Sequence, residues 1–135
     1  RGIYITSSIA GLVGSPGQVA YAASKHAING FMKSLRYELV RDNVHIGLVC
    51  PGPFRPTDHS HDGLGASMES TSGRMLSEDL KSKKMTSQRA AELYVTCMAC
   101  QIGEAWLTYN PILLFTYVQQ YLPFMRGVLV RMVGP

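Results

Sequence analysis

Residues 7–25 read SSIAGLVGSPGQVAYAASK, a stretch that joins an apolar, β-branched segment to the start of an amphipathic pattern. Its glycines stand three apart, at Gly11, Gly14 and Gly17. A dinucleotide-binding turn requires the spacing G-x-G-x-x-G directly before a helix, with an acidic residue about twenty positions further on. The spacing here is G-x-x-G-x-x-G, interrupted by Pro16, so we predict an ordinary turn rather than a phosphate-binding loop.

The segments around this stretch predict a strand, a helix and a second strand in chain order. Residues 3–7 are apolar and β-branched, which is typical of a buried parallel strand. A helix is expected over residues 21–40, and residues 44–50 predict a strand that ends at Pro51. Because strand, helix and strand joined by short links form a βαβ crossover, the two strands should run parallel. The apolar stripe of the helix comprises Ile28, Phe31, Met32, Leu35 and Leu39.

The remaining chain begins with a long polar segment. Residues 54–85 are rich in Ser, Gly, His and Asp, and a segment of this length predicts a substrate-binding loop or lid. Thr86 or Ser87 is suited to N-cap a helix that runs to about residue 101. Residues 104–109 predict a third strand, and an apolar tail follows over residues 111–135.

Residues 105–125 contain no formally charged side chain, and a segment of this length could cross a bilayer. Pro111, Pro123 and several amide side chains argue against such a span. Two interpretations remain open. In the first, the segment is amphipathic and lies on a membrane surface or caps an apolar pocket, which its Tyr and Phe residues and flanking Arg residues favour. In the second, it packs as an ordinary pair of C-terminal helices.

The composition is that of a globular chain, since 46% of its 135 residues are hydrophobic and 16% are charged. The net charge of +4 is mild, and the one dense basic run, residues 81–84, reads as a solvated loop rather than a nucleic-acid interface. Three cysteines are too few for a disulfide framework. Because residues 1–8 already read as a strand, we expect residues 1–135 to be a single but partial domain.

Tyr21 and Lys25 stand four residues apart at the start of the expected helix, so both project from one face. A phenol has a pKa of about 10 and exchanges protons poorly at neutral pH, but a nearby ammonium group favours the phenolate. Tyr21 is therefore a candidate general acid and base, and the Ser8 hydroxyl could hold the substrate oxygen beside it. Ser8, the helix start and Pro51-Gly52 should meet at the carboxyl ends of parallel strands, where open sheets bind ligands.

The motifs SSIAG (residues 7–11), YAASK (residues 21–25) and CPGP (residues 50–53), in this order and spacing, resemble those of the short-chain dehydrogenases/reductases. The resemblance implies an α/β fold that corresponds to the C-terminal half of a Rossmann-type, doubly wound parallel sheet. It also implies an enzyme that transfers hydride between a nicotinamide cofactor and an alcohol or carbonyl group.

The resemblance assigns a role to each matching residue. Ser8 would orient and polarise the substrate oxygen, Tyr21 would supply or remove its proton, and Lys25 would bind the nicotinamide ribose and favour ionisation of Tyr21. The cofactor-binding residues that it implies are Tyr21, Lys25, Pro51, Gly52, the backbone of Phe54 and Thr57, which stands one place later than the family's usual threonine.

The family's Gly-rich turn, its residue that selects NADP or NAD, and its N-N-A-G segment have no counterpart in this sequence. We therefore expect the N-terminal, nucleotide-binding half of the fold to be missing from residues 1–135. Residues 3–7 would then form an apolar sheet edge with unpaired backbone groups.

Residues 24–39, 84–93 and 113–123 look most like the dehydrogenase/reductase member-seven branch, which is akin to 11-beta-hydroxysteroid and retinol dehydrogenases. That branch implies NADP(H) in preference to NAD(H), and a lipophilic substrate such as a steroid or retinoid. It also implies an endoplasmic reticulum membrane location, with the cytoplasm as the alternative. The family further implies a homodimer through the helix of Tyr21 and Lys25. The alternative function is an inactive remnant that acts through dimerisation or membrane association.

His59, His61, Cys97 and Cys100 could together supply four zinc ligands. Cys97 and Cys100 fall within an apolar helical pattern, however, where small thiols commonly fill core space. One C-x-x-C without a second rigid pair is a weak signal, so we predict no metal site.

Overall fold

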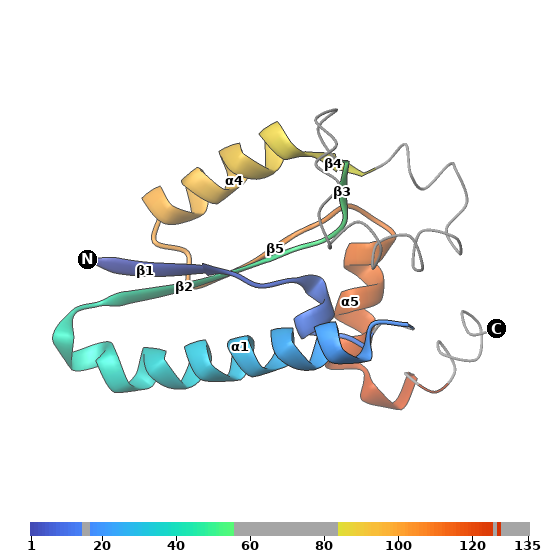
Figure 1. Cartoon of the computed structure of the whole chain (residues 1–135), viewed down its shortest axis with the longest axis horizontal. Coiled ribbons are helices and arrows are strands. Elements are labelled where there is room, and N and C mark those ends of the chain that lie inside the picture. The colour runs from blue at the N-terminus through green and yellow to red at the C-terminus, as the bar shows by residue number, and fades with distance from the viewer. Residues whose placement is uncertain (15–16, 56–83, 126, 128–135) are drawn as a thin grey trace.

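The structure is a computed structural model, and it describes residues 1–14, 17–55, 84–125 and 127. In these residues a parallel sheet lies between helices (Figure 1). In chain order the elements are β1 (Gly2–Thr6), η1 (Ile9–Gly11), α1 (Val19–Glu38), η2 (Leu39–Asp42), β2 (His45–Pro51), β3 (Phe54–Arg55), β4 (Met85–Thr86), α4 (Ser87–Ala99), β5 (Glu104–Leu107), α5 (Ile112–Tyr121) and η3 (Pro123–Met125).

Three strands form the main sheet in the order β1-β2-β5, and both pairings are parallel. Thr6 is opposite Val49 and Pro51 is opposite Leu107, so the three strands end near one edge of the sheet. Helix α1 connects β1 to β2 and lies on one face of the sheet, while α4 lies on the other face (Figure 1). The prediction of an α/β fold with a βαβ crossover is therefore confirmed.

The side chains of β2 divide the core into two parts, because successive residues of a strand point to opposite faces. Ile46, Leu48 and Cys50 pack on the side of Met32 from α1. Val49 packs on the opposite side, with residues of α4 and β5. Strand β2 is buried from its second residue to its last because both of its faces are covered.

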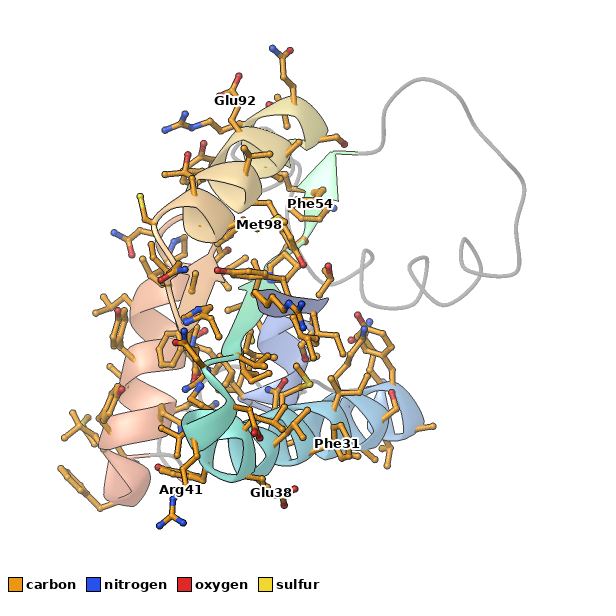
Figure 2. The ribbon with its side chains drawn as sticks, turned by 90° about the vertical axis from the view of Figure 1, so that its left-hand side faces the viewer. Phe31, Glu38, Arg41, Phe54, Glu92 and Met98 are labelled. Atoms are coloured by element: carbon orange, nitrogen blue, oxygen red, sulfur yellow. The ribbon has the colours of Figure 1, made fainter. Side chains whose placement is uncertain are left out.

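Helix α1 begins and ends two residues earlier than expected, at Val19 and Glu38. The helical segment stops after η2, where Asn43 adopts a left-handed conformation with φ 53°. Phe31, at one margin of the apolar stripe, is 65% exposed and faces away from the sheet (Figure 2). Met32, also a member of the stripe, is buried, and Ile28, Leu35 and Leu39 pack against the same core.

Strand β1 is bonded to β2 alone within the described part of the chain, so it forms one edge of the three-stranded sheet. The expectation of a fully buried strand is therefore wrong. Gly2, Ile3 and Thr6 are exposed, and Tyr4 and Ile5 are half-buried, because a strand is bonded along only one side of β1. The expectation of an apolar edge describes this strand better.

Most of the predicted loop over residues 54–85 lies outside the described residues, which omit residues 56–83. The two ends of the loop meet, because β3 and β4 pair in parallel with Phe54 opposite Met85. The predicted N-cap of the next helix is confirmed. The Thr86 hydroxyl oxygen accepts a hydrogen bond from the Arg89 backbone N–H at 3.2 Å.

Helix α4 ends at Ala99 rather than at residue 101. Gln101 adopts a left-handed conformation with φ 50°, and the N–H of Ile102 donates to the carbonyl oxygen of Cys97 at 2.9 Å, which closes the last turn. The third strand was expected over residues 104–109, and β5 stops at Leu107.

Helix α5 buries polar residues and exposes apolar ones. Thr116 and Gln119 are buried, whereas Leu114 and Tyr121 are 61% and 66% exposed. The Thr116 hydroxyl donates to the carbonyl oxygen of Ile112 at 2.9 Å, so its burial leaves that hydrogen satisfied. None of the helices in the described residues has both the length and the hydropathy that a membrane crossing requires.

Candidate active site

Tyr21 and Lys25 lie in the first two turns of α1, and their side chains meet. The Nζ atom of Lys25 is 5.6 Å from the centre of the Tyr21 ring, over its face. Lys25 Nζ also donates to the carbonyl oxygen of Thr6 at 3.5 Å, which holds the ammonium group near the end of β1. Because Tyr21 is exposed and Lys25 is half-buried, a ligand can reach the phenol while the ammonium group stays beside the protein.

Ser8 follows β1 and is the N-cap residue of η1. Its Oγ atom accepts a hydrogen bond from the Ala10 N–H at 3.1 Å. This contact uses one lone pair of the oxygen, so the hydroxyl group still has a hydrogen to donate. Ser8 is half-buried, whereas its neighbour Ser7 is buried. Of the two consecutive serines, Ser8 is therefore the one that a ligand can approach.

The segment that carries Ser8 is fastened to α1 at two further points. The Ser7 hydroxyl donates to the carbonyl oxygen of Lys25 at 3.5 Å. The side-chain amide of Asn29 donates to the carbonyl oxygen of Gly11 at 2.8 Å. Because one contact precedes Ser8 and the other follows it, the serine segment and the first turns of α1 form one structural unit.

Pro51 and Gly52 end β2 at the same edge of the sheet. Pro51 is opposite Leu107, and the Gly52 N–H donates to the carbonyl oxygen of Leu107 at 2.9 Å. Gly52 leaves no room for a side chain, because a Cβ atom there would lie 2.3 Å from Thr108 Oγ1. The backbone then turns into β3 at Phe54.

A small pocket lies beside this edge, where the segments after β2, before β4 and after β5 meet. Lys84 is the one formally charged residue among those that line it, and most of the others are apolar. The pocket has a volume of about 20 Å³, so it has room for little more than a water molecule. Its lining includes Pro53, Lys84, Met85, Thr108, Tyr109 and Ile112.

Three residues considered in the sequence analysis fall outside the described residues: the predicted cofactor-binding residue Thr57, and His59 and His61. Cys97 is buried in the core on the α4 side, and Cys100 is exposed just beyond the helix. The expectation that both thiols fill core space is therefore wrong for Cys100. Across the described ranges, no three His, Cys, Asp or Glu residues gather in a way that could hold a metal ion.

Cys50 lies fully buried in β2, beside the serine segment. Burial raises the pKa of its thiol from its ordinary value near 9 to about 11, and the negative charge of Glu104 adds to the increase. The positive charge of Lys33 lowers this pKa, as do hydrogen bonds with the Ser7 side chain and the Ser8 backbone. Their combined effect is smaller than that of burial. The serine segment therefore rests against a neutral thiol at physiological pH.

Two residues that shape the site were not identified from the sequence. Asn29 stands four residues after Lys25, and its one signal was a polar residue among apolar neighbours in the helix. Thr108 has no local signal beyond its place after β5. Asn29 bonds to Gly11, and Thr108 fills the space beside Gly52 that a side chain would need. Each pair is distant in the chain, so its contact depends on how the elements pack.

Comparison with known proteins adds to this geometry. A family profile described as short chain dehydrogenase matches residues 2–64. The chain is 34% identical to human dehydrogenase/reductase SDR family member 7 over 122 residues, which are 90% of this chain and 35% of that relative. A short chain dehydrogenase from Burkholderia cenocepacia in complex with NADP has a TM-score of 0.66 at 20% identity, over 99% of this chain and 47% of its own. A short chain dehydrogenase/reductase from Burkholderia phymatum in complex with NAD has a TM-score of 0.65 at 24% identity, over 93% of this chain and 49% of its own.

The fold is the Rossmann-type α/β fold, with hydroxyl, phenol and ammonium groups near the edge where its parallel strands end. The chain belongs to the short-chain dehydrogenase/reductase family. The similarity to member 7 from human and mouse confirms the predicted branch. The chain spans about a third of the length of these relatives, 35% in each case.

The raised pKa of Cys50 predicts a specific dependence of stability on pH. The folded protein keeps the thiol proton up to pH about 11, whereas the unfolded chain releases it near pH 9, so stability should fall as pH rises through this window. The loss should be on the order of 2 kcal/mol between pH 8 and 11. Urea unfolding of wild type and Cys50→Ala across this range measures it, and Cys50→Ala should lack this component. The matched control Cys100→Ala should keep the wild-type slope, and equal slopes in all three proteins would contradict the prediction.

Proposed function

We propose that this chain carries the catalytic half of an NAD(P)(H)-dependent oxidoreductase that interconverts a carbonyl and an alcohol on a lipophilic substrate. The observation that carries the proposal is the Lys25 ammonium group over the Tyr21 ring, near the edge where the parallel strands end. The ammonium group is held there by its hydrogen bond to the carbonyl oxygen of Thr6, at the end of β1. Membership of the short-chain dehydrogenase/reductase family supports the same reaction class.

In the mechanism that this proposal implies, Tyr21 is the general acid and base. In the reducing direction its hydroxyl gives a proton to the substrate oxygen, and in the oxidising direction its phenolate removes that proton. Ser8 donates its hydroxyl hydrogen to the same oxygen, which stabilises the charge that develops there. Lys25 keeps its ammonium group beside the ring of this tyrosine.

The residues at this edge fit a nicotinamide cofactor, because the Lys25 ammonium group and the Tyr21 hydroxyl are suitable partners for the hydroxyls of a ribose. When bound, the cofactor supplies or accepts the hydride. Lys25 would hold the nicotinamide ribose, and Pro51, Gly52 and the backbone of Phe54 would border the ring. Resemblance to the member-seven branch supports NADP(H) over NAD(H).

The proposed substrate class rests on the resemblance to the member-seven branch. A steroid or retinoid carbonyl is the substrate type that we propose. The alternative is an inactive member of the family that acts through dimerisation or membrane contact. The resemblance also supports an endoplasmic reticulum membrane location, with the cytoplasm as the alternative.

The catalytic role is tested by Tyr21→Phe in the protein at its natural length, assayed by NADPH oxidation with a panel of lipophilic ketones and aldehydes. Removal of the general acid should lower kcat by on the order of a hundredfold or more, while the protein still melts cooperatively. Tyr37→Phe is the matched control, since Tyr37 lies on the same helix and is 80% exposed. Its kcat should equal that of wild type. Turnover by Tyr21→Phe at the wild-type rate would favour another mechanism, and no turnover by wild type with any substrate would favour the inactive alternative.

We also propose that the outer face of α1 pairs with a second copy of this chain. This face presents Phe31, which is largely exposed and points away from the sheet (Figure 2). Around it stand exposed small residues, so two such helices can approach closely. Those small residues are Ala20, Ala23, Ala27, Gly30 and Ser34.

A charge at the centre of this face should separate the copies. Phe31→Glu is expected to shift a dimer to a monomer in sedimentation velocity, because a buried unpaired carboxylate at an interface is strongly unfavourable. Val95→Glu is the matched control, since Val95 is an exposed apolar residue of α4 on the other side of the sheet. It should leave the dimer intact. A monomeric wild type, or a dimer that Phe31→Glu does not affect, would refute the pairing.

The C-terminal segment supports a third proposal, contact with an anionic membrane surface. The exposed stripe of α5 is apolar and aromatic, with Leu114, Tyr117 and Tyr121 on one side of the helix. Phe124 of η3 extends it. A helix of ten residues is about 15 Å long, half the thickness of the hydrocarbon core, so it can lie on a bilayer but not span it.

The charges and the aromatic side chains of this segment also suit contact with an anionic membrane surface. From residue 105 onward the sequence contains two formal charges, both arginines, and no acid. The ring of Trp106 lies 4.8 Å from that of Tyr117 and 6.3 Å from that of Tyr121, centre to centre. Trp and Tyr favour the membrane interface because each has an apolar body and a polar tip.

Trp106 is the one tryptophan of the sequence, so its fluorescence reports on this face. Vesicles that contain phosphatidylserine should shift its emission to the blue and should sediment with the protein, and phosphatidylcholine vesicles should do so less. The double variant Leu114→Ser/Tyr121→Ser should lose on the order of tenfold in vesicle affinity, given the apolar area removed. Phe31→Ser, on another face, should not. An unshifted emission, or equal binding by both variants, would argue for ordinary packing of this segment.

A further inference from the structure

Asn29 is a buried amide on the inward face of α1, one turn after Lys25 and two turns after Tyr21. Its side chain is 4% exposed, and its Nδ2 atom donates to the carbonyl oxygen of Gly11 at 2.8 Å. Gly11 is the last residue of η1, the short helix that Ser8 caps. The amide therefore connects the helix of Tyr21 and Lys25 to the segment that carries Ser8.

The hydrogen bond to Gly11 satisfies only part of this amide group. A buried amide has two donor hydrogens and an acceptor oxygen to satisfy. Within the described residues, the Oδ1 atom of Asn29 is buried and has no hydrogen-bond partner. Burial of an unsatisfied acceptor is unfavourable, so this side chain is a poor choice for core stability alone. The structural effect that it does produce is the fixed position of the Gly11 carbonyl group.

Gly11 shows how closely η1 approaches the helix. A Cβ atom on Gly11 would lie 2.7 Å from Asn29 Nδ2 and 2.8 Å from the carbonyl oxygen of Lys25. No side chain fits there without displacement of η1 from α1. The hydrogen bond from the Ser7 hydroxyl to the Lys25 carbonyl oxygen, at 3.5 Å, fastens the other side of Ser8 to the same turn of the helix.

We propose that Asn29 is a positioning residue, which fixes Ser8 relative to Tyr21 and Lys25 so that both hydroxyls address one substrate oxygen. This inference rests on the proposed function of the site. Asn29 touches neither substrate nor cofactor and acts through the Gly11 carbonyl group. Two hydroxyls that share one oxygen must be placed closely, because a displacement of about 1 Å can cost a hundredfold in rate.

The test uses Asn29→Leu, which has the same branching and number of heavy atoms and lacks the amide, in the protein at its natural length. We expect kcat to fall on the order of ten- to a hundredfold, while the KM for NADPH changes less than about threefold. Hydrogen exchange at the amides of Gly11 and Leu12, which hold η1 together, should accelerate about tenfold, whereas exchange in β2 stays unchanged. A purely structural role would instead accelerate exchange throughout the core and leave kcat per folded molecule unaltered.

Gly11→Ala and Gly14→Ala provide a second test if Asn29→Leu folds poorly. Gly11→Ala presses on the same contact from the other side and should lower kcat in the same way. Gly14→Ala is its matched control, because a Cβ atom there would meet nothing within 4 Å. Wild-type kcat in Asn29→Leu and Gly11→Ala, together with an inactive Tyr21→Phe, would overturn the positioning role and leave the proposed function standing. An active Tyr21→Phe would overturn both.

Discussion

The parallel pairing of β2 with strands on both of its sides is the constraint on which the rest of the structure depends. Backbone hydrogen bonds to β1 and β5 bring the ends of the three strands to one edge. Helices cover both faces of β2, so its side chains must be apolar and small enough to pack on each side. The edge where the strands end is consequently the place where polar groups from distant segments can meet a ligand.

Polar contacts hold α1 against this sheet near both of its ends. At the carboxyl edge, Lys25 donates to the carbonyl oxygen of Thr6, the last residue of β1, and Asn29 donates to that of Gly11 in η1. At the other end, Arg36 donates to the carbonyl oxygens of Ile46 and Gly103, where β2 and β5 begin. The donors are side chains and the acceptors are backbone carbonyl groups. These contacts therefore position the helix without the need for a carboxylate as the acceptor.

One helix thus serves several purposes at different positions along its surface. Its inward face packs Met32 against β2, its first turns carry Tyr21 and Lys25, and its outer face presents Phe31. The periodicity of 3.6 residues per turn makes this division possible, since neighbours in the sequence point in different directions. The salt bridge between Lys33 and Glu104, at 3.3 Å, adds a link from α1 to β5.

The sequence by itself determined the order of the three main strands and the two helices between them, the parallel crossover, a cap at Thr86 or Ser87, and the pair of Tyr21 and Lys25 on one helical face. Each of these depends on local periodicity, turn chemistry or short spacing, which a single segment contains. The family motifs added the reaction class.

Only the tertiary structure decided how those elements meet. The inward amide of Asn29, the tight contact between Gly52 and Thr108, and the outward position of Phe31 follow from how helices dock on the sheet. The polar interior of α5 belongs with them, because the composition of that helix predicts an apolar interior and its neighbours bury Thr116 and Gln119 instead. Such contacts join residues far apart in the chain, so no local pattern encodes them, and they depend on which surfaces the fold covers.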